Sequence, residues 1–141
     1  MKVVFVYPGY ESLGIESLSA VLRQHGHATS LVFDPQLFAD TFTQVDWLQR
    51  VFDQRRDVAQ QVGDAAPDLI ALSVVTNNMP WFRGMVAALR RVTDAPIVAG
   101  GHHVSAVPEA LMRAVPVDYG VVGEGERALL ALADALATGR D

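Results

Sequence analysis

The amino-acid sequence predicts an α/β fold: a doubly wound, five-stranded parallel sheet with helices on both faces. Five short apolar runs alternate along the chain with five helical patterns, as in a parallel sheet built with right-handed crossovers. The apolar runs are continuous, which is typical of strands buried on both faces. The chain has 141 residues, and 50% of them are hydrophobic. We therefore expect one domain over residues 1–141, with a single core.

The first half of the chain supplies two of the strands. The first is expected over residues 2–7, an apolar run closed by Pro8, and a helix with apolar residues at helical spacing follows over 14–24. The second strand, 27–33, is less apolar and is therefore placed nearer an edge of the sheet. Residues 36–45 show no regular pattern, and Asp46 is expected to cap a helix that runs to Val62.

The second half repeats the alternation of strand and helix. The expected elements are a strand over 69–75, a polar loop over 76–78, a helix over 80–92, a strand over 97–99, a helix over 108–114, a strand over 117–122 and a helix over 124–136. We predict the flavodoxin-like strand order 2-1-3-4-5. Such sheets bind ligands outside the carboxyl ends of their strands, at the switch point between the first and third strands. Function is therefore expected in the loops 8–14, 73–79, 100–108 and 123–126.

Composition excludes several classes of function. The formal charge is −5 and the eleven basic residues are scattered, so no surface for nucleic acid or an anionic membrane is indicated. The absence of cysteine excludes disulfides, thiolate nucleophiles, thiolate zinc sites and iron–sulfur clusters held by this chain. No apolar run approaches the roughly 20 residues of a membrane span, and the amino terminus does not resemble a signal peptide. The expectation is a soluble, cytoplasmic protein.

The loop after the first strand contains Gly9, Tyr10, Glu11, Ser12 and Gly14. It lacks the glycine pattern of dinucleotide-binding loops and the glycines and lysine of nucleoside-triphosphate loops, so neither ligand class is favoured. Ser12 has two interpretations, as a residue of the site or as the cap of the following helix.

The loop after the third strand offers the hydroxyl groups of Ser73 and Thr76 to a polar ligand. The structural alternative is that Ser73 is a small core residue and that residues 76–78 form a turn and a helix cap. Both interpretations remain open at this point.

The fourth strand ends in Gly100 and Gly101, which indicates that bare backbone approaches a ligand. His102 and His103 follow. Adjacent histidines rarely chelate one ion, and no motif indicates Glu109 as a third ligand, so we favour pocket lining over metal binding and assign no metal site.

Gly123, Glu124, Gly125 and Glu126 follow the fifth strand and begin a helix. The helix dipole is a sufficient reason for a carboxylate at Glu126. Two glycines so close together indicate a sharp bend or contact with a ligand. Asp118, at the opposite end of the fifth strand, is interpreted as a turn residue.

Three segments taken together resemble the cobalamin-binding domain found in front of many radical S-adenosylmethionine enzymes. They are Ser73-Val-Val-Thr76, then Val98-Ala-Gly-Gly-His-His103 with Pro108-Glu109, and then Val117-Asp-Tyr-Gly-Val-Val-Gly-Glu-Gly-Glu126. Their order and spacing extend the resemblance over almost the whole chain. It implies a Rossmann-like domain that holds cobalamin over the carboxyl ends of the strands, with the nucleotide tail beside the sheet.

The resemblance also implies roles for individual residues. Ser73 and Thr76 would contact the tail, Gly100 and Gly101 would make room for it, and residues 123–126 would close over its base. The residues expected to contact the cofactor are Tyr10, Glu11, Ser12, Leu13, Gly14, Ser73, Val75, Thr76, Gly100, Gly101, His102, His103, Val122, Gly123, Glu124 and Gly125. No catalytic residue is expected in this chain. A bulky side chain at Gly101 is expected to abolish cobalamin retention and to leave the fold intact.

The first loop departs from the methionine-synthase type of cobalamin domain, which carries an Asp-x-His-x-x-Gly motif. Aligning the motif's glycine on Gly14 puts Gly9 and Glu11 where Asp and His would be. We therefore expect no histidine ligand from the protein, and the resemblance to the radical-enzyme group implies that cobalamin is bound base-off. Residues 10–13 would lie near the lower face of cobalt.

The missing cysteines are a second departure. S-adenosylmethionine and a [4Fe-4S] cluster would bind in a radical domain, either beyond Asp141 in a longer chain or in a separate partner, for methyl transfer or a related radical reaction.

Two other functions are compatible with the same fold. A receiver-type interaction domain needs clustered acids after the first strand, where this chain has Tyr7, Pro8 and Gly9. The nucleotide- or sugar-binding half of a transferase is compatible with the glycine pair.

Overall fold

The computed structural model describes residues 1–9, 12–35 and 54–139. Its strands form one sheet of five parallel strands in the order β2-β1-β3-β4-β5. The strands are β1 (Lys2–Pro8), β2 (Ala28–Asp34), β3 (Leu69–Ser73), β4 (Ile97–Gly100) and β5 (Tyr119–Gly120). The predicted fold class and strand order are confirmed.

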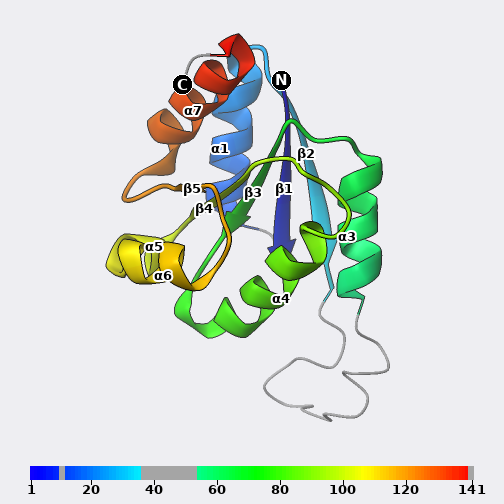
Figure 1. Cartoon of the computed structure of the whole chain (residues 1–141). Helices are drawn as coiled ribbons and strands as arrows, with labels where there is room; N and C mark the ends of the chain where they lie inside the picture. The colour runs from blue at the N-terminus through cyan, green and yellow to red at the C-terminus, as the bar shows by residue number, and fades with distance from the viewer. Residues whose placement is uncertain (10–11, 36–53, 140–141) are drawn as a thin grey trace.

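Helices cover both faces of the sheet (Figure 1). In chain order they are α1 (Leu13–Gln24), α3 (Arg55–Asp64), α4 (Met79–Leu89), α5 (His102–Ala106), α6 (Pro108–Ala114) and α7 (Gly125–Thr138), with a 3-10 turn η1 (Thr76–Asn78) before α4. Helices α1 and α7 pack together on one face, and α3 and α4 on the other. None of the helices in the described ranges is long and apolar enough to cross a membrane.

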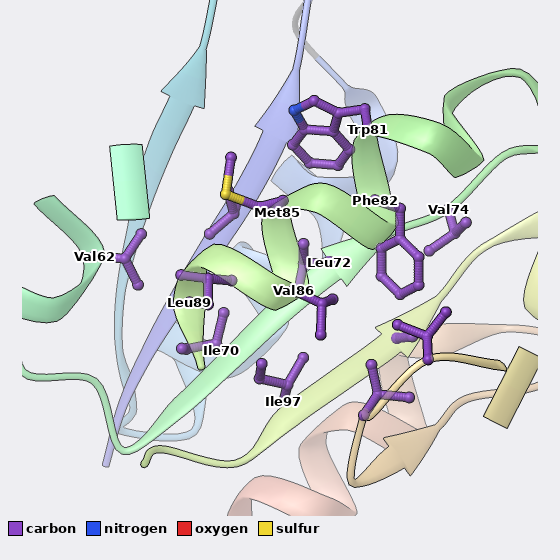
Figure 2. Packing of buried hydrophobic residues seen from close by; sticks show 14 of the residues in the cluster. Val62, Ile70, Leu72, Val74, Trp81, Phe82, Met85, Val86, Leu89 and Ile97 are labelled. Atoms are coloured by element: carbon purple, nitrogen blue, oxygen red, sulfur yellow. The ribbon is translucent and has the colours of Figure 1, made fainter. Parts of the chain in front are cut away.

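The central strand β1 is apolar throughout because both of its faces are covered. Val4 and Val6 are fully buried toward α3 and α4, and Val3 and Phe5 are buried toward α1 and α7. Figure 2 shows the first of these cores, in which Trp81, Phe82, Met85, Val86 and Leu89 of α4 pack on Ile70 and Leu72 of β3. The helix predicted over residues 80–92 is thereby confirmed as α4, with one apolar face toward the sheet.

Several predicted boundaries are wrong in instructive ways. The third strand ends at Ser73 and not at residue 75, because Asn78 Oδ1 accepts a hydrogen bond from the backbone of Val75 (3.0 Å) and draws the chain into η1. The fifth strand is only Tyr119–Gly120 and not 117–122, and the chain bends after it at Gly123, whose φ is 78°. Residues 102–106 form a short helix where a loop is predicted.

The long crossover between β2 and β3 is described only in its second half. Helix α3 spans Arg55–Asp64, and the predicted cap at Asp46 and the irregular segment 36–45 lie outside the described residues. The prediction of a helix is confirmed for the part of it that falls within α3.

Two hydrogen bonds at the carboxyl end of β2 join the end of β1 to the core beneath α4. The carboxylate of Asp34 is 4% exposed and accepts a hydrogen bond from the indole N–H of Trp81 on α4 (2.7 Å). The backbone carbonyl of Asp34 accepts from the N–H of Gly9, the first residue after β1 (3.0 Å). The start of the first loop is therefore fixed to the core beneath α4.

The opposite end of the sheet carries a structural anchor. Asp118 Oδ2 accepts hydrogen bonds from the backbone N–H of Ile97 (2.6 Å) and from Arg90 (2.5 Å). Arg90 also donates to the carbonyl oxygens of Pro116 and Ala95. The interpretation of Asp118 as a structural residue is thus confirmed.

Candidate functional site

A cavity of about 390 Å³ lies at the carboxyl ends of the strands, between the sheet and the pair of helices α1 and α7. This is where parallel sheets of this order bind their ligands. Its lining includes the following residues predicted for the site: Ser12, Gly14, Ser73, Val75, Gly100, Gly101, His102, Gly123, Glu124 and Gly125. Residues from all four predicted loops therefore meet at one place.

The floor of the cavity is a row of side chains across three strands. Phe5 is in register with Ala71, and Ala71 is in register with Val98. Because side chains alternate along a strand, all three point to the face covered by α1 and α7. Ile15 and Leu18 of α1 and Leu129 of α7 complete the apolar lining.

The next row toward the carboxyl ends is the mouth of the cavity. It contains Ser73 and Gly100, which are in register two residues beyond Ala71 and Val98. Polar side chains on the lining of the cavity belong to Tyr7, Ser12, Ser73, His102, Glu124 and Glu126. An apolar floor with a polar mouth suits a ligand that has an apolar ring at one end and a hydrophilic group at the other.

Ser12 is the N-cap residue of α1, and its carbonyl accepts a hydrogen bond from the N–H of Glu16 (3.1 Å). Its backbone is extended (φ −123°, ψ 109°) and its side chain makes no capping hydrogen bond to the described helix. The cap interpretation is therefore right for the position of Ser12 and not for its side chain, and Ser12 lines the cavity.

Gly101 is required by the protein's own backbone. It has φ of 100°, and a Cβ atom on it would lie 2.8 Å from the carbonyl oxygen of Val74 and 3.1 Å from Ser73 Oγ. A bulky residue here would therefore push against the end of β3, so the expectation that the fold would remain intact is wrong. Gly100 is different, since a Cβ atom there would meet Val121 Cβ at an ordinary 3.8 Å.

The start of α7 packs closely on α1 along what we call the α1–α7 seam, formed by Ser17, Leu18, Gly125 and Glu126. Ser17 Oγ donates a hydrogen bond to Glu126 Oε1 (3.0 Å). A Cβ atom on Gly125 would lie 3.0 Å from Leu18 Cδ2, so this glycine allows the two helices to approach. Gly123 has φ of 78°, which accounts for the bend before α7.

Some predicted residues do not line the cavity. Thr76 Oγ1 and His103 Nδ1 lie 3.1 Å apart and pair with each other beside it. Leu13 and Val122 are 83% and 57% exposed near the same edge of the sheet. Tyr10 and Glu11 lie outside the described residues. Within residues 1–9, 12–35 and 54–139, no three His, Asp or Glu side chains converge as a metal site.

The apolar lining is what the sequence reasoning missed. Phe5, Ala71 and Val98 are each two residues from the mouth row or its equivalent on β1, on the same face. These residues can be found by counting back two positions from Ser73 and Gly100, because every second side chain of a strand lies on the same face. In a continuous apolar run that alternation is hidden, because core and cavity residues have the same character.

Comparison with known proteins identifies similar chains. A family model described as the B12 binding domain matches residues 3–133. A tryptophan 2-C-methyltransferase of Streptomyces laurentii is 29% identical over 96% of this chain and 22% of its own length. An uncharacterized methyltransferase of Pyrococcus horikoshii is 32% identical over 100% of this chain and 30% of its own length.

Solved structures agree with the family match. The radical S-adenosylmethionine methyltransferase TsrM of Kitasatospora setae, with tryptophan and a S-adenosylmethionine analogue bound, superposes with a TM-score of 0.80 at 25% identity, over 99% of this chain and 26% of that one. The same enzyme with cobalamin and a [4Fe-4S] cluster bound has a TM-score of 0.75 at 24% identity, over 99% of this chain and 25% of that one. This chain thus spans 22% to 30% of the length of these proteins.

Proposed function

This chain belongs to the B12-binding domain family, whose cofactor is cobalamin, and we propose that it holds cobalamin base-off, without a histidine ligand from the protein, for a radical S-adenosylmethionine enzyme. The family match covers residues 3–133. The finer parts of the proposal concern the bound state of the cofactor and the enzyme that the domain serves.

The observation that carries the proposal is the cavity beneath the carboxyl ends of the strands. Its volume of about 390 Å³ and apolar floor suit the flat benzimidazole ring of the nucleotide tail, and the polar mouth suits the ribose and phosphate. A cofactor bound only by the face of its corrin would need no such cavity. Space for the detached tail therefore supports base-off binding.

The absence of a histidine in the first loop supports the second part of the proposal. Residues 8–14 are Pro, Gly, Tyr, Glu, Ser, Leu and Gly, so this loop offers no imidazole to cobalt. Gly9 is held by the carbonyl of Asp34, which fixes where the loop begins. In this proposal the described loop residues Ser12 and Leu13 face the lower side of the corrin without ligating the metal.

The chain's own part is binding and orientation. When bound, cobalamin supplies a cobalt centre that can carry a methyl group. Ser12 and Ser73 are placed to donate hydrogen bonds to the polar part of the tail, and Phe5, Ala71 and Val98 exclude water from its base. No residue of this chain is proposed to be catalytic.

The enzyme that the domain serves is proposed from its relatives. Those named above are methyltransferases, and each is roughly four times as long as this chain. Because this chain has no cysteine, a [4Fe-4S] cluster and S-adenosylmethionine would be held by a radical domain, in the same polypeptide or in a partner. We propose methyl transfer or a related radical reaction as the chemistry of the enzyme that this domain serves.

Cofactor binding is tested by mixing the purified domain with hydroxocobalamin and desalting it. We expect a red protein with about one cobalamin per chain by absorbance. Ala71→Leu, which extends a side chain from the floor into the cavity, should lose the colour while its circular-dichroism spectrum and melting remain those of a folded protein. A colourless parent protein would refute the proposal.

The bound state is tested on the same complex after reduction to cob(II)alamin. A nitrogen ligand to cobalt splits each line of the electron paramagnetic resonance spectrum into a triplet, and free cob(II)alamin at neutral pH provides that reference. We expect the complex to lack the nitrogen splitting. Retention of the splitting would contradict base-off binding without histidine.

A further inference from the structure

The buried end of the cavity is apolar on every described side. We define the apolar end by Phe5, Ile15, Leu18, Ala71, Val98 and Leu129, which come from three strands and two helices. Phe5, Ala71, Val98 and Leu129 are between 2% and 7% exposed. Their side chains carry no atom that could donate or accept a conventional hydrogen bond.

The polar groups of the lining lie away from this end. Ser73 is two residues beyond Ala71 on β3, a rise of about 6.6 Å along the strand. Glu126 is already bonded to Ser17 in the α1–α7 seam. A ring that reached the apolar end would leave its water partners and would meet no side-chain replacement among the residues that the structure describes.

Resting on the proposed function, we infer that this cavity selects among cobamides by the polarity of the lower base, accepting a benzimidazole and rejecting a purine such as adenine. The two bases are fused bicyclic rings of similar size, so steric fit separates them little. They differ because adenine carries an exocyclic amine and additional ring nitrogens. Buried polar groups without partners destabilise a complex strongly.

The selection is measured by titrating the domain with cobalamin, with pseudocobalamin, whose lower base is adenine, and with cobinamide, which has no nucleotide. We expect pseudocobalamin to bind at least about tenfold more weakly than cobalamin, which corresponds to about 1.4 kcal/mol. Cobinamide reports the contribution of the corrin alone and should bind more weakly than cobalamin. Equal dissociation constants for cobalamin and pseudocobalamin would overturn the inference.

The same titration separates the two proposals. If none of the three compounds binds, the proposed function fails. If cobalamin and pseudocobalamin bind equally, the function stands and the selection is refuted. Cobinamide binding as tightly as cobalamin would refute the inference too, because the nucleotide would then make no contact that could select.

A pair of matched variants places the selection in the cavity. Ala71→Ser adds one hydroxyl group to the middle of the floor row, where it can bond to a purine nitrogen. We expect it to reduce the preference for cobalamin at least about threefold. Ala99→Ser adds the same group to the neighbouring strand on the opposite face, toward α4, and should leave the preference unchanged. A preference that Ala71→Ser does not alter would overturn the assignment to this cavity.

Discussion

Gly100 and Gly101 are adjacent at the end of β4, yet their backbones differ. Gly101 has a left-handed φ of 100° and faces the backbone of Val74, whereas a Cβ atom on Gly100 would make only ordinary contact with Val121. A glycine that serves the fold and a glycine that leaves room at a site look alike in a sequence. Their surroundings in three dimensions distinguish them.

Replacing each glycine with alanine should separate the two roles. Gly101→Ala should lower the free energy of unfolding by about 2–4 kcal/mol, since it combines backbone strain with a contact of 2.8 Å. Gly100→Ala should change it by less than about 1 kcal/mol. Urea unfolding followed by circular dichroism measures both. Equal losses of stability in the two variants would contradict the distinction.

Individual site residues can be predicted from the sequence where a short loop directly follows a clearly apolar strand. Ser73, Gly100 and Gly123 could be placed at the site because each directly follows or ends an apolar run. The floor residue Ala71 could not, because burial in the core and burial under a ligand favour the same side chains. Nor does the spacing of Thr76 and His103 reveal that they pair with each other.

At the scale of elements, the α1–α7 seam determines the width of the cavity. Both helices contribute to its lining through Ile15, Leu18 and Leu129, and Gly125, which also lines the cavity, lets them approach. A side chain added at Gly125 must displace Leu18, which also lines the cavity. The seam therefore couples helix packing to the space available for the cofactor.

The coupling predicts a rescue experiment. Gly125→Ala should push Leu18 into the cavity and raise the dissociation constant for cobalamin roughly five- to tenfold. In the Leu18→Ala background the same change should have little effect, because the clashing atoms are gone. Titration of the four proteins completes the cycle. Additive effects of the two substitutions would argue against the seam.

Secondary structure is predicted best where periodicity is strong and worst where a strand meets a turn. The apolar runs of β1, β3 and β4 and the apolar face of α4 required no tertiary information. The helix α5 depends on a contact between distant segments, the hydrogen bond from the N–H of His103 to the carbonyl of Val74 (3.1 Å). No local pattern encodes such contacts.

For the whole molecule, the two ends of the strands serve different functions. The carboxyl ends of the strands bear the cavity, while the amino ends are tied together by Asp118, Arg90 and the backbone of Ile97. This separation follows from the parallel arrangement, because all loops that lead from a strand to a helix then lie at the carboxyl ends of the strands. Stability and binding should therefore respond to different substitutions.

Asp118→Ala tests the separation. It should lower the free energy of unfolding by about 1–2 kcal/mol, mainly because the N–H of Ile97 loses its partner. The charge pair itself adds little, since the Asp118 side chain is 42% exposed. The dissociation constant for cobalamin should not change. Glu109→Ala is the control, because its ion pair with Arg113 is exposed and its loss should not affect unfolding. A large change in cobalamin affinity in Asp118→Ala would show that the two ends are coupled.

The bonds of Asp34 connect the start of the first loop to the core beneath α4. Its backbone holds Gly9, at the start of the loop beside the cavity, and its carboxylate holds Trp81, in the core on the other face. A displacement of that loop must stretch the bond from Gly9 or carry Asp34 and the indole with it. A ligand that displaces this loop would thus also displace the indole of Trp81 on α4, through two hydrogen bonds. Because Trp81 is buried, its fluorescence provides a means to observe that displacement.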